Sequence, residues 1–221
     1  MLDGVLFDMD GVLCDSERFM TEAAMAMFRN DFQLEVAEED FRPFVGTGED
    51  SYLGGVAEKH GIALDLPDHK LRAYSLYLDA IKGQLQPLPG ALHFVQRLQE
   101  VGRQVAVASS ADRIKVMGSL AEIGLDPDSL AAVVTGDDIA RKKPDPEIYR
   151  SAAAALGLEP GACLVVEDAI SGVRAGKAAG CRVLGVCNSF PADDLQEAGA
   201  DWCTASLETL PGDCLRELGL D

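Results

Sequence analysis

The sequence VLFDMDGV, at residues 5–12, runs from three apolar residues directly into Asp8, Asp10 and Gly11. Short apolar runs without polar alternation are typical of strands that are buried on both faces. Similar runs occur at residues 105–108, 131–134, 164–166 and 183–186. The sequence therefore predicts a parallel sheet.

Amphipathic segments with an apolar repeat of about 3.6 residues separate these strands. They span residues 91–101, 112–123, 146–156 and 170–179, and a glycine suited to a helix C-terminus follows each one. Strands and helices therefore alternate. This order predicts an α/β fold whose core is a doubly wound, Rossmann-like parallel sheet.

The stretch from residue 15 to residue 84 interrupts the alternation. It carries predicted helices at residues 16–28, 37–44, 51–60 and 68–81, with no convincing strand between them. The chain returns to the sheet through QPLPG at residues 86–90, which suits a hinge. We expect a core domain of residues 1–14 and 85–221, with a helical cap domain of residues 15–84.

Composition and charge narrow the class of protein. The 221 residues are 48% hydrophobic and 25% charged, as in a globular protein, and the formal net charge is −18. That charge argues against a nucleic-acid partner, and no apolar run approaches the roughly 18 residues that span a bilayer. The six cysteines form no Cys-x-x-Cys pair, which favours reduced thiols. We expect a soluble protein of a reducing compartment: the cytoplasm, or the plastid stroma if the chain is a trimmed domain.

Polar residues follow four of the predicted strands, at the sheet edge where open parallel sheets bind ligands. They are Asp8 and Asp10, Ser109 and Ser110, Lys142 and Lys143, and Glu167 and Asp168. Crowded carboxylates repel one another, and Mg²⁺ is the cation best suited to hold them in their ionised form. A lysine and hydroxyl groups beside the metal would bind a phosphoryl group, which an aspartate can accept covalently.

Each motif taken alone has a simpler interpretation. An Asp-x-Asp-Gly sequence is often a turn, the serines or Asp168 can cap helices, and the two lysines can be solvated. Their joint occurrence at successive strand ends favours a site. We expect no catalytic role for Cys14 or for the isolated histidines at positions 60, 69 and 93, and we expect Trp202 to lie in the core.

Four segments, taken in order, resemble the signature motifs of the haloacid dehalogenase-like superfamily. They are Asp8-Met9-Asp10-Gly11-Val12, Ser109, Lys143-Pro144 and Glu167-Asp168. The helical insertion resembles the cap of the subgroup that contains beta-phosphoglucomutase and phosphoglycolate phosphatase. The segments at residues 44–49, 53–55 and 106–115 also resemble the phosphatase-like domain of plant suppressor-of-quenching proteins.

The resemblance implies a role for each motif residue. Asp8 would be the nucleophile, and Asp10 would be the general acid and then the general base. Ser109 and the backbone amide of Ser110 would bind phosphoryl oxygens, and Lys143 would neutralise the nucleophile and the phosphate.

The resemblance also implies a Mg²⁺ cofactor. Asp8, Asp168 and the backbone carbonyl of Asp10 would bind the metal, and Glu167 would be either a ligand or an outer anchor. The expected partner is a small phosphorylated metabolite, with no nucleic acid and no membrane insertion. The sequence leaves the oligomeric state open.

The resemblance favours a phosphatase that acts through an aspartyl-phosphate. Dehalogenases lack the second aspartate of the first motif, whereas Asp10 is present here. Mutases of the subgroup carry a histidine where Met20 stands and an arginine in the loop at residues 46–51, which has none here. Two alternatives stay open: a beta-phosphoglucomutase-like transferase, and a regulatory or interaction module that retains the site.

The cap is expected to close over the site and to contribute one loop to it. Candidates for this substrate-facing loop are Gly46, Thr47, Gly48 and Glu49, although an ordinary turn between helices is an equal alternative. Arg113 and Lys115 follow the serine motif. Their side chains could contact the substrate or be solvated, and we expect them to be solvated.

Overall fold

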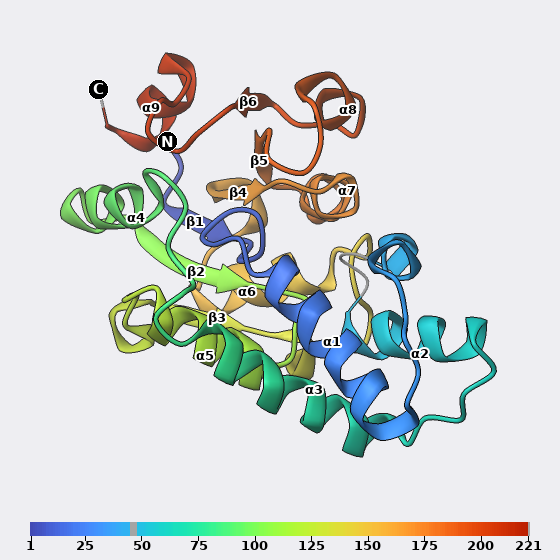
Figure 1. Ribbon diagram of the computed structural model, residues 1–221. Coiled ribbons are helices and arrows are strands. Elements are labelled where there is room, and N and C mark those ends of the chain that lie inside the picture. The colour runs from blue at the N-terminus through green and yellow to red at the C-terminus, as the bar shows by residue number, and fades with distance from the viewer. Residues whose placement is uncertain (45–47, 221) are drawn as a thin grey trace.

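The computed structural model describes residues 1–44 and 48–220, which form a sheet of six parallel strands in the order β3-β2-β1-β4-β5-β6 (Figure 1). The strands are β1 (Gly4–Phe7), β2 (Gln104–Ala108), β3 (Ala132–Val134), β4 (Cys163–Glu167), β5 (Arg182–Val186) and β6 (Trp202–Thr204). Val5 of β1 pairs with Val105 of β2 on one side and with Leu164 of β4 on the other. The predicted parallel α/β sheet is confirmed, with the VLFDMDGV segment at its centre.

Helices cover both faces of the sheet. One core cluster joins Val5 and Phe7 to helices α4 (Ala91–Glu100), α5 (Arg113–Glu122) and α9 (Gly212–Leu218). A second cluster joins Leu6 to helices α6 (Glu147–Ala155), α7 (Ile170–Ala179) and α8 (Ala192–Glu197). Successive side chains of β1 thus point to opposite faces and all are fully buried, which explains why its sequence is apolar without alternation.

Between β1 and α4, the described part of the chain forms three helices. They are α1 (Glu17–Phe32), α2 (Glu49–Lys59) and α3 (Leu66–Ile81), and α1 packs along α3 at one side of the sheet (Figure 1). The helix predicted at residues 37–44 is wrong: two short 3₁₀ turns, Glu38–Asp40 and Arg42–Phe44, occupy that stretch. Pro43 lacks the amide hydrogen that a continuous helix would use. The division into a core and a cap domain stays a prediction.

The C-terminal part contains elements that the sequence analysis did not predict, namely α8, β6 and α9. All six cysteine thiols are free, and four of them are buried. Within residues 1–44 and 48–220, no helix has the length and apolar character required to cross a membrane.

Candidate active site

Three buried carboxylates meet at the carboxyl ends of β1 and β4. Asp8 directly follows β1, Glu167 is the last residue of β4, and Asp168 follows it. One carboxylate oxygen from each residue lies within 4.8 Å of the others. Lys143, from the loop between β3 and α6, places its Nζ 2.5 Å from Asp8 Oδ1 and 2.7 Å from Glu167 Oε1. The fold thus gathers side chains that are up to 160 positions apart in the sequence, from 8 to 168.

Hydrogen bonds occupy both oxygens of Glu167. Its Oε1 accepts from Lys143 Nζ and, at 2.9 Å, from the hydroxyl of Tyr149. Its Oε2 accepts from the backbone amides of Asp168 and Ala169, both at 2.9 Å. A Cβ atom on Gly172 would overlap this carboxylate, so the first turn of α7 approaches Glu167 only because it has a glycine there. Glu167 is therefore rigidly placed and has little capacity left for a ligand.

The electrostatics of the cluster favour a cation. Burial raises the pKa of Asp8 to about 7, although Lys143 opposes the shift. Burial, with the charges of Glu167 and Asp8, also raises the pKa of Asp168 far above its usual value. Burial disfavours the ammonium of Lys143, but Asp8 and Glu167 raise its pKa overall. One lysine thus faces three carboxylates, and their ionised form needs further positive charge.

The donor set fits a hard divalent cation such as Mg²⁺, because it consists of oxygen atoms and leaves Asp168 without a cationic partner among the described residues. The hydroxyl of Ser189 donates a hydrogen bond to Asp168 Oδ2. Gly11 lies against the same carboxylate with a φ of +76°, and a Cβ atom there would overlap it. The turn after β1 therefore requires glycine, both for its backbone conformation and for the approach of Asp168.

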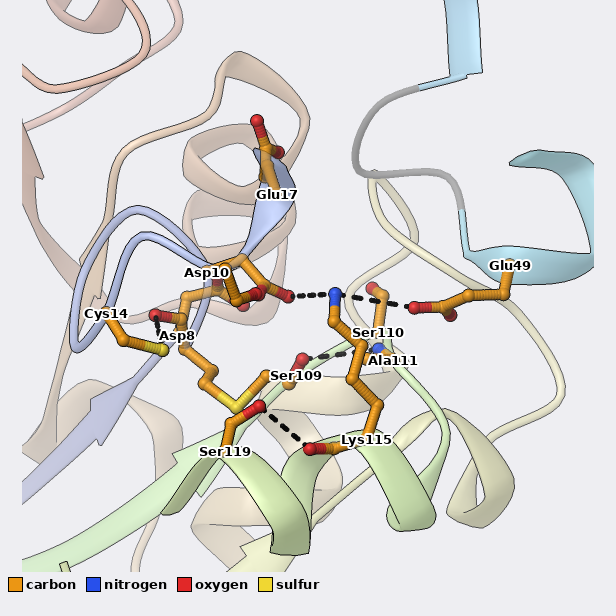
Figure 2. A network of polar contacts seen from close by, with 12 residues as sticks. Asp8, Asp10, Cys14, Glu17, Glu49, Ser109, Ser110, Ala111, Lys115 and Ser119 are labelled. Carbon is orange, nitrogen blue, oxygen red and sulfur yellow. Dashed lines mark hydrogen bonds and ion pairs between the residues drawn. The ribbon is translucent and has the colours of Figure 1, made fainter. Parts of the chain in front are cut away.

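The side chain of Asp10 lies outside the group of three carboxylates and takes part in a second network (Figure 2). Its Oδ1 accepts a hydrogen bond from Ser16, and its Oδ2 lies 3.0 Å from Lys115 Nζ. The expectation that Lys115 is solvated is wrong, because this side chain is buried between Asp10 and Glu49. Arg113 is exposed and pairs with an aspartate at the surface, as expected.

The serine motif also lies at this edge of the sheet. Ser109 and Ser110, which follow β2, are both buried. Ser109 Oγ accepts from the backbone amide of Ala111, whereas Ser110 Oγ forms no hydrogen bond within the described part of the chain. Neither serine caps α5, whose N-cap residue is Asp112. A buried hydroxyl without a partner beside the carboxylates is consistent with a group that binds a ligand.

The side chains of the two lysines in the third motif, Lys142 and Lys143, make different contacts. Lys143 is buried within the carboxylate cluster. Lys142 donates to the backbone carbonyls of Ser110 and Gly136, each at 3.0 Å, and so ties together the loops after β2 and β3. Asp168 does not cap a helix either, because Ala169 is the N-cap residue of α7. The Asp-x-Asp-Gly segment does form a turn, but the side chains of Asp8, Lys143 and Asp168 meet in one buried cluster and do not serve as helix caps or as solvated surface groups.

A cavity of about 730 Å³ opens onto these groups. Asp8, Asp10, Ser109, Lys143 and Asp168 line its floor, and the segments between β1 and β2 supply much of the opposite wall. From the predicted cap loop, Gly48 and Glu49 line the cavity, whereas Gly46 and Thr47 lie outside the described residues. Met20 also lines it, as part of the buried face of α1.

Sequence reasoning missed three residues of the site, Ser16, Tyr149 and Ser189, and placed Lys115 in solvent. The sequence carries a signal for only one of them, since Ser16 precedes a helix and reads as a cap. Its hydroxyl donates a hydrogen bond to Asp10 and forms no side-chain cap hydrogen bond.

Residues that we expected to be uninvolved lie apart from this chemistry. Burial raises the pKa of the Cys14 thiol far above its usual value, so it is no nucleophile. His60 and His69 contact Asp40 and the carbonyl of Asp65 respectively. Trp202 is half-buried in β6 and packs against the core.

Comparison with known proteins gives the family. A family model described as haloacid dehalogenase-like hydrolase matches residues 2–180. The chain is 42% identical over 201 residues to Protein SUPPRESSOR OF QUENCHING 1, chloroplastic, of Arabidopsis thaliana. That match covers 90% of this chain and 19% of the relative, so the chain spans about a fifth of that protein.

Other relatives match over most of their length. Validoxylamine A 7'-phosphate phosphatase of Streptomyces hygroscopicus subsp. limoneus is 31% identical over 194 residues, which cover 87% of this chain and 89% of the relative. The crystal structure of CbbY from Rhodobacter sphaeroides in complex with phosphate is 25% identical, with a TM-score of 0.86 over the full length of both chains. The chain therefore belongs to the haloacid dehalogenase-like hydrolases and is an enzyme of their phosphatase class.

Proposed function

We propose that this chain is a Mg²⁺-dependent phosphatase that hydrolyses a small phosphorylated metabolite through an aspartyl-phosphate on Asp8. The observation that carries the proposal is the buried cluster of Asp8, Lys143, Glu167 and Asp168 at the floor of a cavity of about 730 Å³. Both the Asp8 carboxylate and the Lys143 ammonium that is paired with it line the cavity that a substrate would occupy.

Transfer to the enzyme is the first step. An oxygen of Asp8 forms a bond to phosphorus while the bond from phosphorus to the ester oxygen breaks. The electron pair of that bond stays on the ester oxygen, which takes a proton from Asp10 and leaves as an alcohol. Lys143, 2.5 Å from Asp8 Oδ1, holds the nucleophile in place.

Hydrolysis of the intermediate is the second step. Asp10, now a carboxylate, takes a proton from a water molecule whose oxygen attacks phosphorus. The bond between phosphorus and Asp8 breaks, which releases inorganic phosphate and restores the Asp8 carboxylate. Ser109 and the amide of Ser110 would hold phosphoryl oxygens through both steps, with the unpartnered Ser110 Oγ close by.

Asp8, Asp168 and the backbone carbonyl of Asp10 would hold the metal. Glu167 would act as the outer anchor, because both of its oxygens are already occupied by hydrogen bonds. When bound, Mg²⁺ supplies positive charge that offsets the negative charge on the transferring phosphoryl group.

An anionic substrate is supported by the wall of the cavity. Arg18, Arg42 and Arg174 line it, all three are exposed, and none forms a hydrogen bond or an ion pair with another described residue. In a chain with a net charge of −18, three such guanidinium groups around one opening favour the entry of an anion. The relatives named for phosphate ester substrates point in the same direction.

The test is hydrolysis of a generic aryl phosphate by purified protein with Mg²⁺. Asp8→Asn should abolish turnover, because the amide cannot form the acyl phosphate. Asp193→Asn, which changes an exposed aspartate on α8, should keep wild-type activity and thus control for the loss of one carboxylate. Equal activity in the wild type and Asp8→Asn would refute the assignment.

A further inference from the structure

A buried lysine connects the acid–base residue to the first residue of helix α2. Lys115 is 5% exposed, and its Nζ lies 3.0 Å from Asp10 Oδ2 and 3.5 Å from Glu49 Oε1 (Figure 2). The two carboxylates are therefore separated by a single nitrogen atom. Since one ammonium faces two carboxylates, this wall of the cavity keeps an excess negative charge.

Glu49 has one oxygen that no described residue uses. The side chain is 6% exposed, its Oε1 pairs with Lys115, and its Oε2 is buried and accepts no hydrogen bond from another described residue. Glu49 also lines the cavity that contains Asp8 and Asp10. A buried carboxylate oxygen without a donor is costly, so a donor from a bound molecule would be favourable.

The position of Glu49 places it near the carbon atoms of the substrate that lie next to the ester oxygen. If Asp10 acts on the ester oxygen, as proposed above, then the carbon atoms nearest that oxygen lie beside the Lys115 ion pairs. A hydroxyl one carbon beyond the phosphate-bearing carbon could donate to Glu49 Oε2. A carboxylate at the same place would meet Glu49 with Lys115 already paired on both sides.

We propose that Glu49 is a specificity-determining residue that selects phosphate esters with a neighbouring hydroxyl group and rejects those with a neighbouring carboxylate. This inference rests on the proposed phosphatase function and names its substrate class: phosphate monoesters of polyhydroxy compounds, as opposed to phosphorylated hydroxy acids.

Three esters that differ at a single group test the proposal. They are 2-hydroxyethyl phosphate, ethyl phosphate and 2-phosphoglycolate, each measured with Mg²⁺ as kcat/KM. For the wild type we expect 2-hydroxyethyl phosphate to exceed ethyl phosphate by at least about tenfold, because the hydroxyl satisfies a buried acceptor. The expected value for 2-phosphoglycolate is the lowest of the three.

Substitution of Glu49 should change these ratios. Glu49→Gln keeps the shape and removes the charge, so the preference for 2-hydroxyethyl phosphate over 2-phosphoglycolate should fall at least about tenfold. Glu58→Gln is the matched control, since Glu58 is exposed on the same helix, and it should keep the wild-type ratios. Glu49→Asp, which keeps the charge but shortens the reach, serves as the second variant and should lose the preference over ethyl phosphate.

Binding separates the inference from the proposed function. The same three esters are titrated calorimetrically into Asp8→Asn and into Asp8→Asn combined with Glu49→Gln, so that no turnover is needed. Loss of the preference only in the combined variant supports the role of Glu49. Equal turnover ratios in Glu49→Gln and Glu58→Gln, together with equal binding ratios in the single and the combined Asp8→Asn variants, would overturn it even though the protein is a phosphatase. Absence of aryl phosphate hydrolysis by the wild type would instead refute the proposed function.

Discussion

Asp40 shows how one carboxylate can organise a turn outside the cluster of catalytic carboxylates. Its Oδ1 accepts from Lys59 Nζ at 2.5 Å, and its Oδ2 lies 2.8 Å from His60 Nε2. The backbone amide of Ala37 donates to Oδ2 at 3.2 Å and closes the 3₁₀ turn. Hydrogen bonds from Lys59 and His60 hold the pKa of Asp40 well below its usual range, although burial opposes them. The carboxylate is therefore favoured by the folded state.

This shift predicts a pH-dependent cost for Asp40→Asn. Because the pKa is lower in the folded state than the value of about 3.9 in the unfolded chain, the stabilisation is complete above that value. It is lost as the pH falls toward the folded pKa. Urea unfolding should show a larger loss of unfolding free energy for Asp40→Asn at pH 5.5 than at pH 3.5. Asp128→Asn, at an exposed aspartate, should show little loss at either pH. An equal loss for Asp40→Asn at both pH values would contradict the linkage.

At the scale of residues, the sequence predicted the motif side chains but not their supports. Asp8, Lys143, Glu167 and Asp168 follow strand ends, and the edge of a parallel sheet brings strand ends together. Lys115 follows no strand, and its partner Asp10 is 105 positions away. A lysine in a helix reads as solvated unless the acidic groups that surround it are known, and only the tertiary packing supplies them.

Contact between α3 and α5 joins the helices after β1 to the sheet region. The hydroxyl of Tyr77, on α3, lies 2.6 Å from Ser119 Oγ, on α5. Ser119 Oγ donates at 2.8 Å to the carbonyl of Lys115, so it accepts from Tyr77. Both residues are fully buried. The hydrogen bond therefore fixes α3 against the helix that carries Lys115.

A double-mutant cycle measures this contact between helices. Tyr77→Phe and Ser119→Ala should each lower the unfolding free energy by about 1 kcal/mol, the usual value for one buried hydrogen bond. The double variant should lose clearly less than the two single losses combined, with a coupling of about 0.5–1.5 kcal/mol. Chemical denaturation of the four proteins gives the numbers. Additive losses would show that the two hydroxyls do not interact.

Prediction of elements succeeded where the chain is strongly periodic. Helix α7 (Ile170–Ala179) was predicted with the observed bounds, since its apolar repeat is regular and Gly180 ends it with a φ of +98°. Strand β6 has only three residues and helices α8 and α9 have six and seven. Segments this short carry too few residues to establish a period. Their formation depends on tertiary contacts, such as the pairing of β6 with β5, which the sequence alone does not show.

Considered as a whole, the molecule is strongly acidic, with a net charge of −18, but it places cationic side chains around its cavity. Lys115 and Lys143 are paired with carboxylates at the inner wall, and three exposed arginines that line the cavity form no ion pair with another described residue. At physiological ionic strength the field of distant acidic residues is screened beyond roughly 8 Å. A phosphorylated substrate thus responds to the cavity and not to the net charge, which explains how a strongly acidic protein can take an anionic ligand.

Metal binding should stabilise the whole fold, because the proposed ligands connect β1 to the start of α7 and exist as a cluster only in the native state. A ligand present at 100 times its Kd adds about 2.7 kcal/mol to the unfolding free energy. For a chain of this length that corresponds to a rise in Tm of about 5–10 °C. Thermal unfolding with and without Mg²⁺ measures the shift, and a chelator should reverse it. Asp168→Asn should reduce the shift strongly, whereas Asp193→Asn should leave it intact. An identical Tm with and without Mg²⁺ in the wild type would contradict a metal site at these carboxylates.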